Sequence, residues 1–168
     1  REKVEALLYC MDSNDYQPDK LYGPYDWIHF DQIAWYRKQS ARFTKENNGN
    51  PVPALAFFHI PLLEYNEIAG DGKTFGNNRE GEVASANINS GMFASFIDMK
   101  DVMGVFAGHD HDNDYLGINK GIVLGYGRVT GADAYGELTR GARIIELYEG
   151  KFRFDTWITT PSGREATY

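Results

Sequence analysis

The sequence contains a single cysteine, Cys10, which excludes both an internal disulfide framework and a cysteine-ligated zinc cluster. Cys10 follows an apolar run at 6–9, so we expect its thiol to be buried and inert. No apolar run approaches the ~20 residues of a membrane-spanning helix. One cysteine does not assign a compartment, and a secreted or periplasmic location of the intact protein is compatible with it.

The sequence also lacks a stretch of clustered basic residues. Its 17 lysines and arginines are outnumbered by 24 aspartates and glutamates, which gives a formal net charge of −7. Nothing in this pattern neutralises a phosphate backbone, which argues against nucleic-acid binding. A small phosphorylated substrate held by metal ions remains compatible. The hydrophobic share of 42% and the length of 168 residues indicate one folded domain.

Short apolar runs alternate with one long and one short helical pattern, which predicts an α/β fold. The expected strands are 4–9, 54–58, 102–107, 122–126, 142–148 and 152–158, and the last two are expected to form a hairpin turning at 149–150. The expected helices are 27–45, with Asp26 as its N-cap, and 92–98. The polar stretch 64–87 is too long for a plain connector, and we expect residues 161–168 to be a frayed tail.

Three of the four histidines follow apolar runs. His59 ends one run, and Gly108-His109-Asp110-His111 ends another. A lone histidine such as His59 is more often structural, but His-x-His places two imidazoles within reach of metal ions a few ångströms apart. The next three residues, Asp112, Asn113 and Asp114, are expected to accept the second ring N–H groups. The alternative for this segment is a polar surface loop.

These segments in combination resemble the calcineurin-like metallophosphoesterase superfamily. His59 matches its lone-histidine block, and Gly108-His109-Asp110-His111 matches its Gly-His-x-His block. The likeness spans nearly the whole chain and narrows to purple-acid-phosphatase-like proteins of the Dcr2 type. The segments that narrow it are 25–28, 89–93, Gly108–Tyr115, 126–131, 135–136 and 140–143. The upstream blocks of the superfamily, Asp-x-His, Gly-Asp-x-x-Asp and Gly-Asn-His, have no match before His59.

The resemblance implies that residues 1–160 are the C-terminal half of a metallophosphoesterase domain, a β-sandwich flanked by helices. In such an enzyme His59 and His109 would bind one metal ion and His111 the other. The two ions, of Fe, Zn or Mn, activate water that attacks a phosphate mono- or diester of a small molecule or protein. The remaining ligands, and any signal peptide, would lie upstream in the N-terminal half of the same polypeptide.

Such a half would bind at most one ion weakly and would be inactive alone, because three neutral imidazoles cannot bridge two cations. Its exposed sheet face predicts self-association. Arg128 either reaches the substrate phosphate or pairs with Asp133 or loop carbonyls. Two other functions compete: a non-catalytic binding module derived from a phosphatase half, and a mononuclear metal protein of the cupin kind, which would be an all-β barrel.

Overall fold

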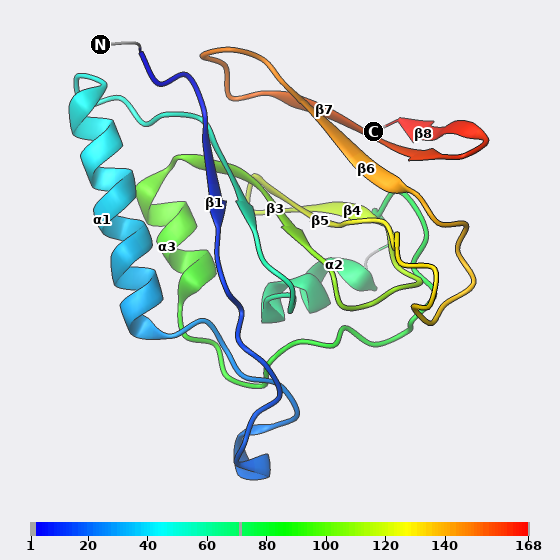
Figure 1. Cartoon of the computed structure of the whole chain (residues 1–168). Coiled ribbons are helices and arrows are strands. Elements are labelled where there is room, and N and C mark those ends of the chain that lie inside the picture. Colours follow the sequence, from blue (N-terminus) through cyan, green and yellow to red (C-terminus); the bar gives the residue numbers. More distant parts are fainter. Residues whose placement is uncertain (1–2, 71, 168) are drawn as a thin grey trace.

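A five-stranded mixed sheet lies at the centre of the molecule, with α1 and α3 on one side and a three-stranded antiparallel sheet on the other (Figure 1). The computed structural model describes residues 3–70 and 72–167. The strand orders are β1-β2-β3-β5-β4 and β6-β7-β8. The strands are β1 Leu7–Cys10, β2 Ala54–Phe57, β3 Val102–Ala107, β4 Leu116–Asn119, β5 Ile122–Tyr126, β6 Ala142–Leu147, β7 Phe154–Thr160 and β8 Gly163–Thr167. The helices are α1 Phe30–Glu46, α2 Asn66–Ala69 and α3 Met92–Met99, with short 3-10 turns η1 Lys20–Tyr22 and η2 Leu63–Tyr65.

The parallel strands determine where the helices lie. β1 pairs with β2, β2 with β3 and β3 with β5, all in parallel, so the chain must cross over the sheet between them. Right-handed crossovers that step in one direction along a sheet place their helices on the same face. Accordingly, Tyr36 of α1 and Phe96 of α3 are fully buried in one cluster with Val105 and Leu124. No helix of the described residues is long and apolar enough to cross a membrane.

A buried carboxylate joins the long helix to the sheet. Tyr9 donates to Asp101 Oδ2 at 2.8 Å, and Tyr36 donates to Asp101 Oδ1 at 2.5 Å. Asp101 is 1% exposed. Two phenol donors compensate this carboxylate for its lost hydration, because a buried polar group without a partner is costly.

The predicted elements on the helix-covered side are confirmed, with shifted ends. Strands 102–107 and 122–126 match β3 and β5, and β2 ends one residue early. The long helix begins at Phe30, after His29, and not at Trp27 as predicted. Gln32 Oε1 accepts the backbone N–H of His29 at 2.7 Å, whereas the expected cap Asp26 accepts from Trp27 and contacts the His29 ring. The cap is therefore three residues later than expected.

Two strands were not predicted. β4 runs antiparallel to β5 at the sheet edge, through a turn at Lys120-Gly121. The segment expected to be a frayed tail contains β8, which pairs with β7. Backbone hydrogen bonding to a neighbouring strand orders both segments, and neither has a long apolar run to signal it.

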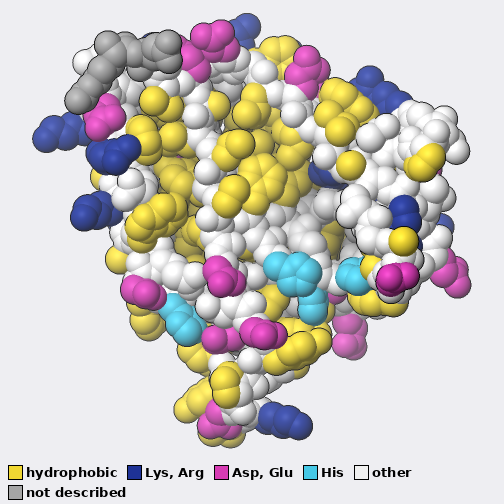
Figure 2. Space-filling view, in the orientation of Figure 1, with side chains coloured by type: hydrophobic (Ala, Val, Ile, Leu, Met, Phe, Trp, Pro, Cys, Tyr) yellow, Lys and Arg dark blue, Asp and Glu magenta, His cyan; other side chains and the backbone are white. Residues whose placement is uncertain are grey.

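The face of the large sheet opposite the helices is covered only in part. Ile145, Leu147 and Phe154 of the small sheet pack over Leu55 and Phe106. At the β1 edge, however, Leu8 is 59% exposed, and Cys10 is exposed. The prediction that Cys10 is buried was therefore wrong, because it lies on the uncovered side of an edge strand. Figure 2 shows hydrophobic side chains gathered over this face.

Candidate metal centre

The carboxyl ends of two neighbouring parallel strands bring His59 and His109 together. Phe57 of β2 is in register with Phe106 of β3, and the chain beyond them stays paired, since Gly108 N donates to His59 O at 3.0 Å. The imidazole nitrogens His59 Nε2 and His109 Nδ1 lie 3.1 Å apart, with ring planes at 85°. Residues fifty positions apart in the sequence thus place two ring nitrogens at one point.

This separation fits two ligands of one metal ion. Two nitrogens that each lie about 2.0–2.1 Å from an ion, at angles of about 90° to 110°, are about 2.9–3.4 Å apart. The pair at 3.1 Å falls within that interval. Burial, followed by the charge of His59, lowers the pKa of His109 below its ordinary value. The neutral imidazole that binds a metal ion is therefore favoured there.

Local backbone structure holds the two rings in place. His109 has a left-handed conformation with φ of 73°, which turns its side chain toward His59 directly after the strand ends. A Cβ at Gly108 would lie 3.2 Å from His59 Nδ1, so a side chain there would crowd the ring. On the other side, the hydroxyl of Ser13 accepts the backbone N–H groups of His59 and Ile60 at 3.1 and 2.7 Å. Ser13 was not among the predicted site residues, because it lies in the loop after β1 with no motif to mark it.

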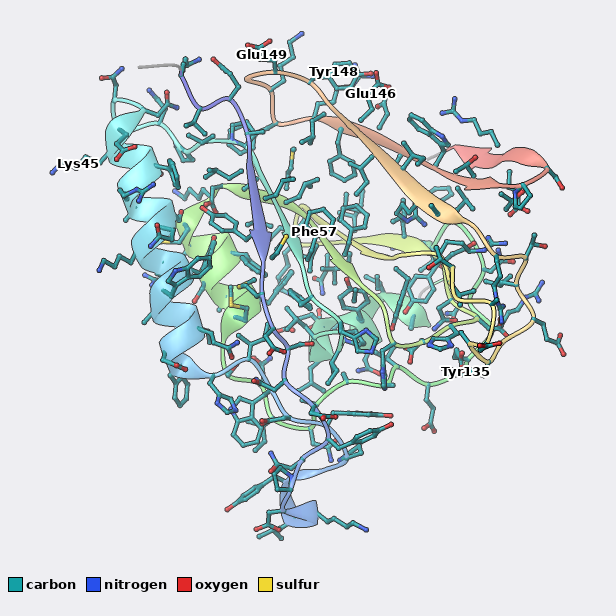
Figure 3. All side chains as sticks on the ribbon, viewed as in Figure 1. Lys45, Phe57, Tyr135, Glu146, Tyr148 and Glu149 are labelled. Carbon is teal, nitrogen blue, oxygen red and sulfur yellow. The ribbon has the colours of Figure 1, made fainter. Side chains whose placement is uncertain are left out.

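His111 is oriented separately from the pair. Its Nδ1 lies 3.1 Å from the backbone oxygen of Tyr135, and its ring stacks on the Tyr135 ring at 3.9 Å. Since a carbonyl only accepts, Nδ1 is the donor in this contact, which leaves Nε2 as the ring nitrogen placed to bind a ligand. Figure 3 shows Tyr135 on the loop beyond β5, at the same end of the sheet as the histidine loops. Residues 135–136 were singled out only as part of the resemblance, and the contact of Tyr135 with His111 was not predicted.

Asp112, Asn113 and Asp114 bind neighbouring loops. Asp112 Oδ1 accepts the backbone N–H groups of Glu137 and Leu138, and Asn113 Oδ1 accepts those of Arg79 and Glu80. Asp114 accepts from Asn77 and Arg128. The contacts of Asn113 and Asp114 pin residues 77–80 onto the histidine loop. The expected contacts from these three side chains to the imidazoles are not among the hydrogen bonds of the described residues.

Asp110, between the two histidines, points into the protein. Its Oδ2 accepts from the buried Tyr126 hydroxyl at 2.6 Å and from Ala84 N at 3.3 Å. Burial raises the pKa of this carboxyl above its ordinary value. Asp110 therefore anchors the turn that carries His109 and His111.

Of the two roles expected for Arg128, its surroundings match the structural one. Its side chain is 2% exposed and pairs with Asp114 and with Glu165 of β8, and Nε donates to Thr139 O at 2.8 Å. One of these partners is a loop carbonyl, as the structural alternative predicted, but the carboxylates differ from the expected Asp133. A phosphate would have to displace these partners.

Within residues 3–70 and 72–167, the structure has no group of three or more His, Cys, Asp or Glu side chains arranged to hold a metal ion. The arrangement is a pair of convergent imidazoles with a third nearby.

Comparison with known proteins shows the family to which this chain belongs. The chain is 39% identical over 165 residues to a protein of Arabidopsis thaliana named probable inactive purple acid phosphatase 29. The matched region covers 94% of this chain and 42% of the relative. It is 40% identical over 152 residues to probable inactive purple acid phosphatase 28 of the same plant, covering 89% and 38%. It is 34% identical over 119 residues to the phosphatase DCR2 of Saccharomyces cerevisiae, covering 66% and 19%. The chain belongs to the purple acid phosphatase-like proteins.

This purple acid phosphatase-like chain spans about 40% of the length of its first two relatives. No protein-family model and no solved structure matches it. Both plant relatives above carry the word inactive in their names.

Proposed function

We propose that this chain supplies the C-terminal metal ligands of a two-metal phosphoester hydrolase. The observation that supports the proposal is the 3.1 Å separation of His59 Nε2 and His109 Nδ1, which suits one ion. His111, with Nε2 left for a ligand, would serve the second ion. Metal ions in such sites lower the pKa of water and neutralise charge on a phosphate ester. Fe, Zn and Mn all accept this ligand type.

The carboxylates of the histidine loop have other roles. A two-metal site requires a carboxylate between cations about 3.5–4 Å apart. Asp110 accepts from Tyr126, Asp112 from two backbone amides and Asp114 from Arg128. We therefore propose that the bridging carboxylate and the remaining ligands come from an N-terminal portion of the intact polypeptide, as the greater length of the relatives suggests.

The uncovered sheet face supports the same proposal. Phe57 lines a cavity of about 520 Å³ between β2, β3 and β6, and Figure 3 shows its ring directed toward the β6–β7 hairpin. Further strands beside the small sheet would cover the rest of this face and complete a β-sandwich with helices outside. In that arrangement the chain is the C-terminal half of the domain, and the N-terminal half brings its ligands to the histidine edge.

Metal binding tests the half-site directly. We expect the chain, purified without chelator, to hold at most one ion, easily removed, as measured by elemental analysis. His59→Ala should weaken Mn²⁺ binding by at least about tenfold, whereas His29→Ala should not change it, because His29 lies at the start of α1 beside Asp26. Equal affinity of the two variants would refute the site. Two tightly held ions would refute an incomplete centre.

A non-catalytic binding module is the second candidate, and the names of the plant relatives favour it. Hydrolysis of 4-nitrophenyl phosphate by the intact polypeptide separates the two functions. Metal-dependent turnover that His59→Ala abolishes supports the hydrolase, whereas metal binding without turnover supports the module. The mononuclear cupin alternative does not fit, because the chain forms a mixed, mostly parallel sheet with helical crossovers and not an all-β barrel.

A further inference from the structure

Tyrosine rings from two distant loops surround the three histidines. Tyr16 and Tyr25 come from the segment between β1 and α1, and Tyr135 comes from the segment between β5 and β6. Together with the three imidazoles they line a pocket of about 310 Å³. This volume lies at the lower end of the range for small-molecule sites.

One wall of the pocket is built on His109. The Tyr25 ring meets the His109 ring edge to face, with centroids 4.7 Å apart and planes at 83°. Tyr16 lies against Tyr25, with centroids 5.6 Å apart, and the two residues form an antiparallel backbone bridge. Tyr16 is nevertheless 68% exposed, so most of its ring contacts no part of the protein.

The opposite wall is built on His111. Tyr135 stacks on this imidazole, donates its hydroxyl to His109 O at 3.2 Å and accepts from His111 N at 3.3 Å. These bonds fix the ring, although the residue is 56% exposed. The structure thus holds aromatic surface in place at the pocket without burying it.

The pocket offers no cationic side chain for a phosphate. No lysine or arginine of the described residues lines it, and Asp15 is its one carboxylate. An anion would therefore depend on metal ions at the histidines, whereas an aromatic group would depend on the tyrosines. The anionic part and the aromatic part of a ligand would therefore be recognised by separate groups. Experiments can change one kind of recognition without the other.

We propose that this site selects phosphate esters whose phosphoryl group is attached directly to an aromatic ring, as in a phosphorylated phenol. The inference rests on the proposed metal-dependent function and adds the substrate class. Tyr25 and Tyr135 contact the imidazoles themselves, and Tyr16 extends the wall from Tyr25, so a ring packed on this wall lies next to whatever the histidines hold. The base of a nucleotide is a ribose away from its phosphate and reaches this wall less well.

Phosphonates test the proposal because they bind without turnover. Calorimetry with the chain in saturating Mn²⁺ should show phenylphosphonate binding about 5- to 10-fold more tightly than methylphosphonate, a ratio expected for one aromatic contact. Tyr16→Ala should reduce that ratio toward one, and Tyr16→Phe, which keeps the ring, should retain it. Tyr22→Ala is the matched control, because Tyr22 is exposed in the same segment and packs near Trp27, outside the pocket.

The outcomes separate the two proposals. Equal, Mn²⁺-dependent binding of both phosphonates would overturn the substrate class and leave the metal-dependent function standing. Failure of both phosphonates to bind with Mn²⁺ would overturn the substrate class, whereas the metal-dependent function is overturned separately, by equal Mn²⁺ affinity of His59→Ala and His29→Ala. Tighter binding of 5′-AMP than of phenylphosphonate would overturn direct attachment of the ring. An unchanged ratio in Tyr16→Ala would also overturn the proposal, because the wall would then have no role.

Discussion

The two faces of the five-stranded sheet differ in how completely this chain buries them. On one face, α1 and α3 cover Tyr9, Val105 and Leu124, which are at most 3% exposed. On the other face, β6 and β7 cover the middle, but Leu8 at the edge remains exposed. The core on the helix-covered face is complete within these residues, whereas the opposite face is covered only in part. The partly covered face adjoins the histidine edge, as expected if the proposed N-terminal half packs against both.

Paired leucine truncations test this contrast most strongly. Leu124→Ala should lower the free energy of unfolding by about 2–5 kcal/mol, because it removes a fully buried side chain from the helix-covered core. Leu8→Ala should change it by no more than about 0.5 kcal/mol, because Leu8 is largely exposed. Urea unfolding monitored by circular dichroism measures both. A comparable loss in Leu8→Ala would show that the second face is buried in solution.

Alkaline pH distinguishes the faces through buried tyrosines on the helix-covered side. Burial, aided by Asp101, raises the pKa values of Tyr9 and Tyr36 far above that of an exposed tyrosine, and burial raises that of Tyr115 to about 12. Above about pH 10 the unfolded chain loses protons that the folded chain retains. The contribution of these tyrosines to the free energy of unfolding is therefore fully present below about pH 10. It falls as the pH rises further, by about 1.4 kcal/mol per pH unit for each such tyrosine.

Tyr36→Phe sharpens that test. The substitution should lower the free energy of unfolding by about 1–3 kcal/mol at neutral pH, because Asp101 loses a hydrogen-bond donor. It should also reduce the fall of that free energy at alkaline pH by about 1.4 kcal/mol per pH unit. Urea unfolding at pH 7, 10 and 11 provides both numbers. An unchanged slope would mean that this hydroxyl is already ionised or exposed in the folded protein.

The helix-covered core was the part most readily predicted from the sequence. Continuous apolar runs such as 102–107 are buried on both faces whatever covers them, so β3 could be located to the residue. Cys10 could not be judged in the same way, because its burial depends on what packs against an edge strand. β4 and β8 are short edge strands ordered by backbone pairing, which leaves little trace in side-chain pattern.

The candidate site shows the same division. The proximity of His59 and His109 follows from two apolar runs that end in histidine, since parallel strands end at one edge. The groups that orient the rings, Ser13 and the Tyr135 carbonyl, come from loops whose path depends on the whole fold. Asp112 and its neighbours were predicted from adjacency alone, and the turn after His111 directs them toward other loops.

The uncovered face leads to the smallest expected effect, weak self-association of the chain. Apolar surface left in water at the β1 edge, where Leu8 is exposed, favours pairing with another such face. Leu8→Glu should weaken this association by about tenfold, because a carboxylate would have to be desolvated at the contact. Sedimentation velocity over a range of concentrations measures it.

Leu21→Glu provides the control for Leu8→Glu. Leu21 is 82% exposed in η1, away from the sheet, so the same substitution adds the same charge without touching the face. If both variants associate as the unmodified chain does, the contact lies elsewhere. A chain that stays monomeric at all concentrations would mean that β6 and β7 shield the face well enough by themselves. Only the geometry of the histidine pair would then support the proposed N-terminal half.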